Sequence, residues 1–90
     1  MFRYKKTMKA DYLRQGYAYF LSHRYDLISP GQRAQMDALF LKCGGIHAEA
    51  LRDYMTRDLS AVTVCRKHYL SERTLMRAVH RYYENFPDNL

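Results

Sequence analysis

The sequence predicts an all-α fold with a single domain of about five helices. Apolar residues recur at spacings of three and four along most of the chain, which is typical of amphipathic helices. No segment shows the alternating pattern of a β-strand, and no Asn-Gly or Asp-Gly pair marks a hairpin. The chain has 90 residues, the size of one small domain, and no linker or internal repeat indicates a second one.

A first helix is expected from about residue 6 to residue 23. Its apolar residues fall on one largely aromatic stripe: Met8, Tyr12, Leu13, Tyr17, Tyr19, Phe20 and Leu21. Packing against the protein's own core is one explanation of this stripe. It has more aromatic surface than a three-helix core requires, so we also expect self-association around Tyr12, Tyr19 and Phe20. The opposite face is not continuously basic, which argues against a membrane-surface helix.

A second helix is expected to begin at Pro30. Ser29 can cap it, proline suits the first helical position, and Gln32 can complete a capping box. The helix then presents an apolar seam made of Met36, Leu39 and Phe40. Gly44-Gly45 should end it, because glycine tolerates the left-handed conformation that follows a last turn.

Three more helices are expected in the second half of the chain. The first runs from about residue 46 to residue 57 and should turn one face inward, made of Ile46, Ala50, Leu51, Tyr54 and Met55. The next is short, begins at Ser60 and covers about residues 61–67. The last begins at Ser71 and ends near Asn85, before Pro87.

The last two helices are close enough in sequence to form a helix-turn-helix over about residues 60–85. In such a unit the first helix needs a small residue at the crossing point, and Cys65 is suitably placed. Apolar residues should lock the pair together: Val64, Leu70, Leu75, Ala78 and Val79. Glycine is common at the turn, where this chain has Tyr69, and a bulky residue at positive φ is costly. We therefore expect a distorted turn.

The charge of the chain indicates a polyanionic partner. Fifteen Lys and Arg residues stand against nine Asp and Glu residues, a net charge of +6. Arg73, Arg77 and Arg81, spaced four residues apart, lie along the last expected helix. The side chains expected in a DNA groove are Ser71, Arg73, Arg77 and His80, and those expected at phosphates are Arg66, Lys67 and Arg81. The acidic residues are expected on helix surfaces among cations.

Three sequence blocks resemble the PapB/FocB-type regulators of adhesin and fimbrial operons. Leu27–Gly31, with the apolar helix behind it, is similar to the family's Pro-Gly start. Leu51–Met55 resembles its Lys-Asp-Tyr-Leu block, and Val64–His68 resembles its Val-Cys-Glu-Lys-Tyr block, with Arg81 matching a basic residue downstream. Thr74–His80 is also similar to the recognition helices of Cro and KorA-type repressors.

The resemblance to the PapB/FocB family implies a small transcription regulator in the bacterial cytoplasm, associated with the nucleoid. Such a protein would bind AT-rich double-stranded DNA as a dimer or higher oligomer and contact the minor groove. The rival interpretation is a protein-interaction module, an adaptor or antagonist of another regulator that uses the aromatic first helix as its contact face.

Other classes of protein are disfavoured. No Ser/His/Asp set, paired carboxylates or glycine-rich phosphate loop indicates an enzyme. Cys43, His47, Cys65 and His68 have spacings that a structural zinc could use, but Cys65 falls inside a helical pattern. We therefore expect no metal or cofactor and interpret both cysteines as small buried apolar residues. No apolar run is long enough to span a membrane, and no secretory signal is evident.

Overall fold

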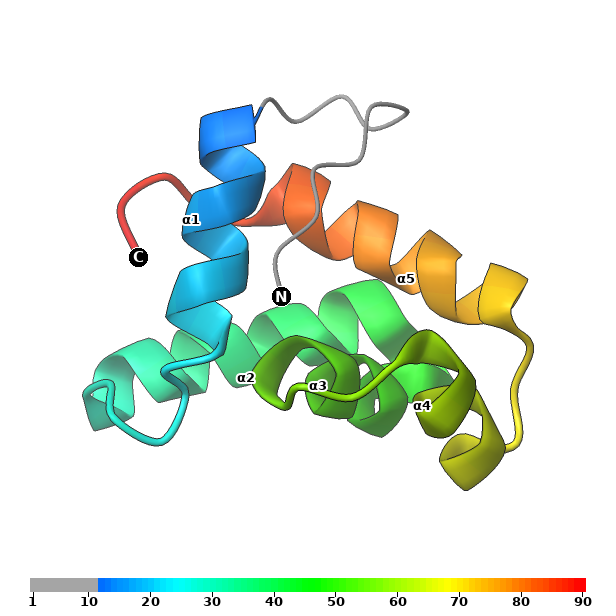
Figure 1. Cartoon of the computed structure of the whole chain (residues 1–90). Coiled ribbons are helices and arrows are strands. Elements are labelled where there is room, and N and C mark those ends of the chain that lie inside the picture. The colour runs from blue at the N-terminus through cyan, green and yellow to red at the C-terminus, as the bar shows by residue number, and fades with distance from the viewer. Residues whose placement is uncertain (1–11) are drawn as a thin grey trace.

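The computed structural model describes residues 12–90, which fold into helices without any strand (Figure 1). The helices are α1 (Tyr12–Ser22), α2 (Pro30–Gly44), the 3₁₀ turn η1 (Gly45–His47), α3 (Ala48–Thr56), α4 (Ala61–His68) and α5 (Glu72–Asn85). The all-α prediction is confirmed for this part of the chain. Because α2, η1 and α3 follow one another without a loop, the described residues form four helical runs rather than five separate helices.

The start of α2 has the predicted capping box. The Ser29 side chain accepts the backbone N–H of Gln32 at 3.2 Å, and the Gln32 side chain accepts the backbone N–H of Ser29 at 3.2 Å. Pro30 occupies the first helical position, where its missing N–H leaves no hydrogen bond unmade. These bonds satisfy donors that a helix start otherwise leaves open.

Gly45 folds α3 back onto α2. Its dihedral angles are φ 56° and ψ −124°, a conformation that L side chains rarely adopt. The two helices consequently pack against each other although no loop separates them. The prediction that Ile46 points inward is wrong: the residue is 96 % exposed. It lies in the 3₁₀ turn, whose tighter period rotates its side chain away from the face that α3 buries.

The core lies where α2, α3 and α5 meet. The rings of Phe40 and Tyr82 stack with their centroids 5.0 Å apart, and Phe86 meets Tyr82 edge-on at 5.4 Å. Met36 and Leu51 are fully buried beside them in the same cluster. The apolar faces predicted for α2 and α3 are therefore largely the ones that are buried.

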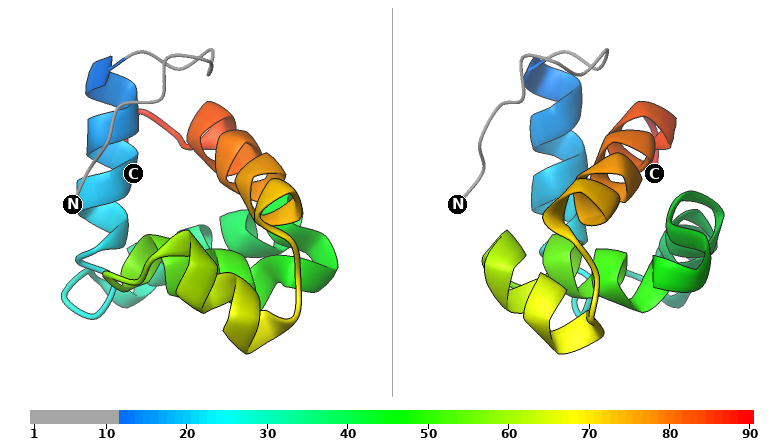
Figure 2. Two further views of the ribbon diagram at one scale, coloured as in Figure 1. Left: turned by 45° about the vertical axis from the view of Figure 1, so that its right-hand side comes forward. Right: turned by 90° about the vertical axis from the view of Figure 1, so that its right-hand side faces the viewer.

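Helix α1 stands against the C-terminal end of α5 (Figure 2). Its Arg14 donates to the backbone carbonyls of Glu84 and Phe86, at 3.4 and 3.2 Å, where α5 ends. The buried residues of α1 are Gln15, Ala18 and Ser22, not the aromatic stripe. Residues 6–11, including Met8, lie outside the described part. None of the described helices is long and apolar enough to cross a membrane.

Candidate nucleic-acid interface

Helices α4 and α5 are joined by three residues, and each begins with a serine cap. Ser60 accepts the backbone N–H of Thr63 at 3.1 Å, and Ser71 accepts that of Thr74 at 3.1 Å. The connection adopts the left-handed conformation at Tyr69, with φ 56° and ψ 49°. These are ordinary left-handed values, so the turn itself is regular, but it does hold a bulky residue at positive φ, as the sequence indicated.

Buried apolar residues hold the two helices together. Most of the side chains predicted to lock the pair are at most 8 % exposed, namely Val64, Cys65, Leu75, Ala78 and Val79, and Leu70 is half-buried. Helix α3 packs against both α4 and α5, so each of the three helices touches the other two. Helix α5 is thereby held on a rigid support.

Three arginines on this pair of helices are exposed, and their side chains make no hydrogen bond or ion pair with another described residue. Arg73 and Arg77 lie one turn apart on α5, and Arg66 lies on α4. A guanidinium group without an internal partner keeps all five of its N–H donors for a ligand. The structure therefore leaves these three side chains available on one helix pair.

The other residues predicted to contact DNA are placed differently. The Ser71 hydroxyl, besides capping α5, donates to the Thr74 hydroxyl at 2.9 Å. Arg81 Nε donates to the backbone carbonyl of Cys43 at 2.9 Å and so satisfies an acceptor in the last turn of α2. His80 is half-buried on α5.

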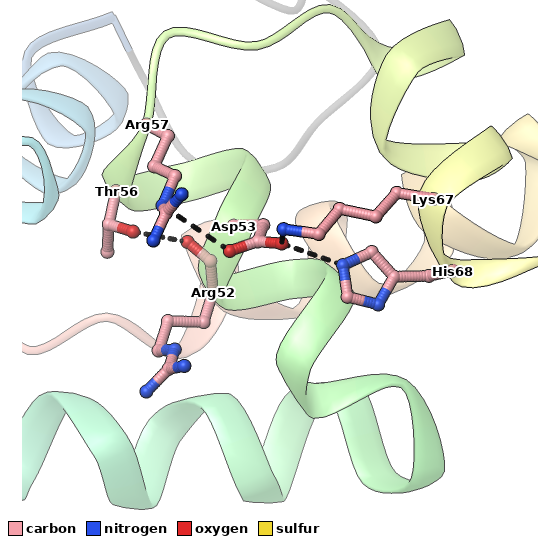
Figure 3. A network of polar contacts seen from close by, with 6 residues as sticks. All are labelled: Arg52, Asp53, Thr56, Arg57, Lys67 and His68. Carbon is pink, nitrogen blue, oxygen red and sulfur yellow. Dashed lines mark hydrogen bonds and ion pairs between the residues drawn. The ribbon is translucent and has the colours of Figure 1, made fainter.

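Lys67 takes part in a polar cluster centred on Asp53 (Figure 3). Asp53, in α3, is buried, and only 9 % of its side chain is exposed. Its carboxylate lies 2.9 Å from Lys67 Nζ and 2.7 Å from His68 Nε2, both at the end of α4. Arg57 Nε lies 3.6 Å away on the solvent side. Because an ionised carboxylate can only accept hydrogen bonds, the Nε2 atom of His68 must carry its proton.

This cluster changes the ionisation of Asp53. Burial alone would raise the pKa of the carboxyl group, because it disfavours the charged form. The hydrogen bonds from His68 and Lys67, together with their charges, outweigh burial and lower the pKa below its ordinary value of 3.8. Asp53 therefore remains ionised at neutral pH and fixes the end of α4 to α3.

The sequence did not reveal the role of Asp53. All acidic residues were expected on helix surfaces, and for Asp53 that expectation is wrong. The signal was present, since Asp53 follows Ala50 by three residues and so borders the inward face of α3. Its partners could not be chosen from the sequence, because they depend on how α4 crosses α3.

The two cysteines are buried free thiols. Burial raises the pKa of both Cys43 and Cys65, so both are protonated at neutral pH. Among residues 12–90, no group of three or more His, Cys, Asp and Glu side chains is arranged to hold a metal ion. His68, one of the four candidate zinc ligands, is turned to Asp53 instead.

The aromatic stripe of α1 divides between two environments. Tyr19 packs against the core and its ring lies 4.1 Å from that of His23. Four other apolar side chains remain strongly exposed, with exposed fractions of 39–78 %: Tyr12, Leu13, Tyr17 and Phe20. They border a shallow apolar groove along the helix, which also includes Gly16 and Leu21. We refer to this surface as the α1 face.

No protein-family model, curated protein or solved structure matches the chain. The resemblance to PapB/FocB-type regulators therefore rests on the sequence blocks described above.

Proposed function

We propose that this protein is a DNA-binding transcription regulator, in which α4 and α5 act as a helix-turn-helix and α5 is the recognition helix. The observation that carries the proposal is the presence of Arg66, Arg73 and Arg77 on this helix pair, exposed and without a hydrogen-bond or ion-pair partner among residues 12–90. Their charge is not neutralised within the described protein, so it is available for a polyanion.

The packing of the helix pair supports the same proposal. A recognition helix must enter the groove as a rigid body, and α5 is supported by α3 and α4 along its buried side. Arg73 and Arg77 lie one turn apart, near the start of α5, where a recognition helix reaches base edges. Guanidinium groups can bind the O6 and N7 atoms of guanine with two hydrogen bonds.

The proposed contacts differ in kind. Arg73 and Arg77 would read base edges, whereas Arg66 would bind phosphate and fix the register of the complex. Lys67 is about half-exposed, but its ammonium group is already paired with Asp53, so it is a weaker candidate for a phosphate contact. Ser71, His80 and Arg81 remain secondary candidates, because Ser71 and Arg81 already make hydrogen bonds within the protein and His80 is half-buried.

A homodimer or higher oligomer is part of the proposal. One helix-turn-helix covers few base pairs, and such proteins gain specificity by pairing half-sites. The α1 face offers an apolar surface for this contact. The resemblance to adhesin-operon regulators adds AT-rich repeats as the target and a fimbrial operon as the context.

The second candidate function is a protein-interaction module. The α1 face favours it, because an exposed apolar patch on a small protein commonly marks a protein contact. In that case α1 would bind another regulator, and the arginines of α4 and α5 would be a solvated surface.

Selection from a pool of random DNA duplexes tests the proposal. The protein is expected to enrich AT-rich repeats and to lose affinity by more than about tenfold between 50 and 200 mM salt, as multi-phosphate binders do. An unenriched pool, retained equally at both salt concentrations, would contradict the proposal and favour the interaction module.

A pair of charge-matched variants separates the proposed interface from general basicity. Arg77→Ala and Arg24→Ala each remove one positive charge. Arg24 lies in the connection between α1 and α2, which Figure 1 shows on the other side of the molecule from the connection between α4 and α5. Retention on the selected duplex should fall in Arg77→Ala and change little in Arg24→Ala. Equal losses would contradict the assignment of the interface to α5.

A further inference from the structure

Tyr69 holds a backbone conformation that is unfavourable for its residue type. Within the described part, it is the one residue other than glycine with positive φ. Its N–H and that of Leu70 both donate to the carbonyl of Cys65, the latter at 3.1 Å, and so close the end of α4. A glycine would make the same hydrogen bonds at a lower conformational cost.

In the free protein, the side chain of Tyr69 does not offset this conformational cost by burial or by a polar interaction. It is 95 % exposed and touches no ring, ion or hydrogen-bonding group of the described residues. A large aromatic side chain at such a site neither fills the core nor caps a helix. Strained residues that lack internal compensation are concentrated at functional sites.

The surroundings of Tyr69 specify the kind of partner. Arg66 and Lys67 precede it in the last turn of α4, and Arg73 follows it in the first turn of α5. Glu72 is the only acidic residue between Ser60 and Tyr83. A phenol flanked by cations suits a phosphate backbone, since its hydroxyl can donate to a phosphate oxygen while its ring covers the sugar.

We infer that Tyr69 is a DNA-backbone contact at the turn between α4 and α5, retained there at the expense of the stability of the free protein. The inference rests on the proposed function and adds a residue that charge alone does not indicate. Such a contact is independent of base sequence, so it should contribute equally to the selected site and to random DNA.

Substitutions at Tyr69 should shift stability and DNA binding in opposite directions. Tyr69→Gly relieves the backbone strain and should raise the melting temperature by about 4–8 °C. It also removes the contact and should weaken binding by about tenfold on both kinds of DNA. Tyr69→Asn, which tolerates the left-handed region without the flexibility of glycine, should show the same pattern. Tyr69→Phe should leave the melting temperature unchanged and lose part of the affinity.

The melting temperature and fluorescence-anisotropy titrations of the full chain are measured for all four proteins. A glycine variant that melts higher yet binds DNA as well as the wild type would overturn the assignment of the contact. If that variant instead lost self-association, the ring would belong to a protein contact, and the inference would again be overturned. A melting temperature that does not rise would contradict the strain argument. Absence of DNA binding by the wild type would mean that the proposed function has failed, which is a different result.

Discussion

The hydroxyl groups of Ser22 and Tyr82 lie 2.6 Å apart inside the core and join the end of α1 to α5. Both side chains are fully buried, so this bond has no competition from water. Burial raises the pKa of Tyr82 far above its ordinary value, and the phenol remains a neutral hydrogen-bonding group at any physiological pH. Helix α1 is thus attached to the core by a polar contact as well as by apolar packing.

Removing this contact should destabilise the protein. Tyr82→Phe keeps the ring that stacks on Phe40 but leaves the Ser22 hydroxyl buried without a partner, which should cost about 1–3 kcal/mol in the free energy of unfolding. Urea denaturation measures the change. Tyr83→Phe is the matched control, because Tyr83 is equally buried and its hydroxyl bonds to no described residue. Adding Ser22→Ala to Tyr82→Phe should recover part of the loss, and a further loss would contradict the pairing.

Replacing Asp53 should loosen α4. In Asp53→Asn the uncharged amide no longer attracts Lys67 and offers a weaker acceptor to His68, so the free energy of unfolding should fall by about 1–3 kcal/mol. Glu49→Gln, an exposed carboxylate of the same helix, serves as the control and should change it by less than about 0.5 kcal/mol. Equal effects of the two substitutions would show that the cluster contributes nothing specific.

The same carboxylate should make the protein sensitive to acid. A carboxyl group whose pKa is lower in the folded state stabilises the protein above its unfolded pKa, and this stabilisation is lost as the pH falls through the folded pKa. For Asp53 the loss should begin below about pH 4–5 and continue below the ordinary value of 3.8. Unfolding free energies measured from pH 7 to pH 2 should show a smaller acid-side decline in Asp53→Asn than in the wild type. Parallel curves would contradict the lowered pKa.

Two arginines one turn apart on α5 should have separate roles. Arg81→Ala removes the hydrogen bond to the Cys43 carbonyl and should lower the free energy of unfolding by about 1–2 kcal/mol. Arg77→Ala removes an unpaired exposed side chain and should change it by less than about 0.5 kcal/mol while weakening DNA binding. Thermal melts and DNA titrations of both variants test this division. A large stability loss in Arg77→Ala would mean that its side chain has a structural role.

Arg77 should read bases rather than only supply charge. Arg77→Lys keeps the charge and loses the two-pronged guanidinium, so it should cost about 1–3 kcal/mol on the selected site and little on random DNA. Arg66→Ala serves as the comparison, because Arg66 is the proposed phosphate contact. It is preferred to Lys67→Ala because Lys67 also binds Asp53. It should weaken both kinds of DNA similarly and make the salt slope shallower by about one. If Arg77→Lys lost the same affinity on selected and random DNA, Arg77 would contribute only its positive charge.

The α1 face should carry the self-association. Leu13 is 78 % exposed, so Leu13→Glu should reduce the oligomer seen by light scattering without lowering the melting temperature. Ile46→Glu, a change at an even more exposed apolar residue of η1, is the control and should leave oligomer size unchanged. Tyr19 is less suitable for this test, because it packs against the core. A monomeric wild type at all concentrations would contradict the prediction.

The features that the sequence predicted well depend on neighbouring residues. The capping serines at positions 29, 60 and 71 bond to N–H groups three residues ahead, so local chemistry determines them. The periodic burial of α5 was predicted for the same reason, since Leu75, Ala78 and Val79 follow one helical face.

The features that were missed depend on distant packing. The direction of Ile46 follows from the way in which α3 folds back on α2, and the burial of Asp53 follows from the approach of α4. The α1 face stayed exposed because small and polar residues of that helix, Gln15, Ala18 and Ser22, meet the core instead. For the candidate site, the exposure of Arg66 and Arg73 agreed with the sequence, whereas the internal bond of Arg81 required a carbonyl 38 residues away.

The backbone angle at Gly45 determines more than the direction of one turn. If residues 30–56 formed one straight helix, it would be about 40 Å long, which exceeds the 32 Å of the longest dimension of the molecule. A residue that favours ordinary helical angles at this position, as in Gly45→Ala, would promote that straight form. The segment after the glycine would then leave its own α2 and could complete the core of a second chain, while that chain did the same in return. The positive φ of Gly45 allows residues 30–56 to pack as two helices within one chain, and Gly45→Ala should favour a domain-swapped dimer.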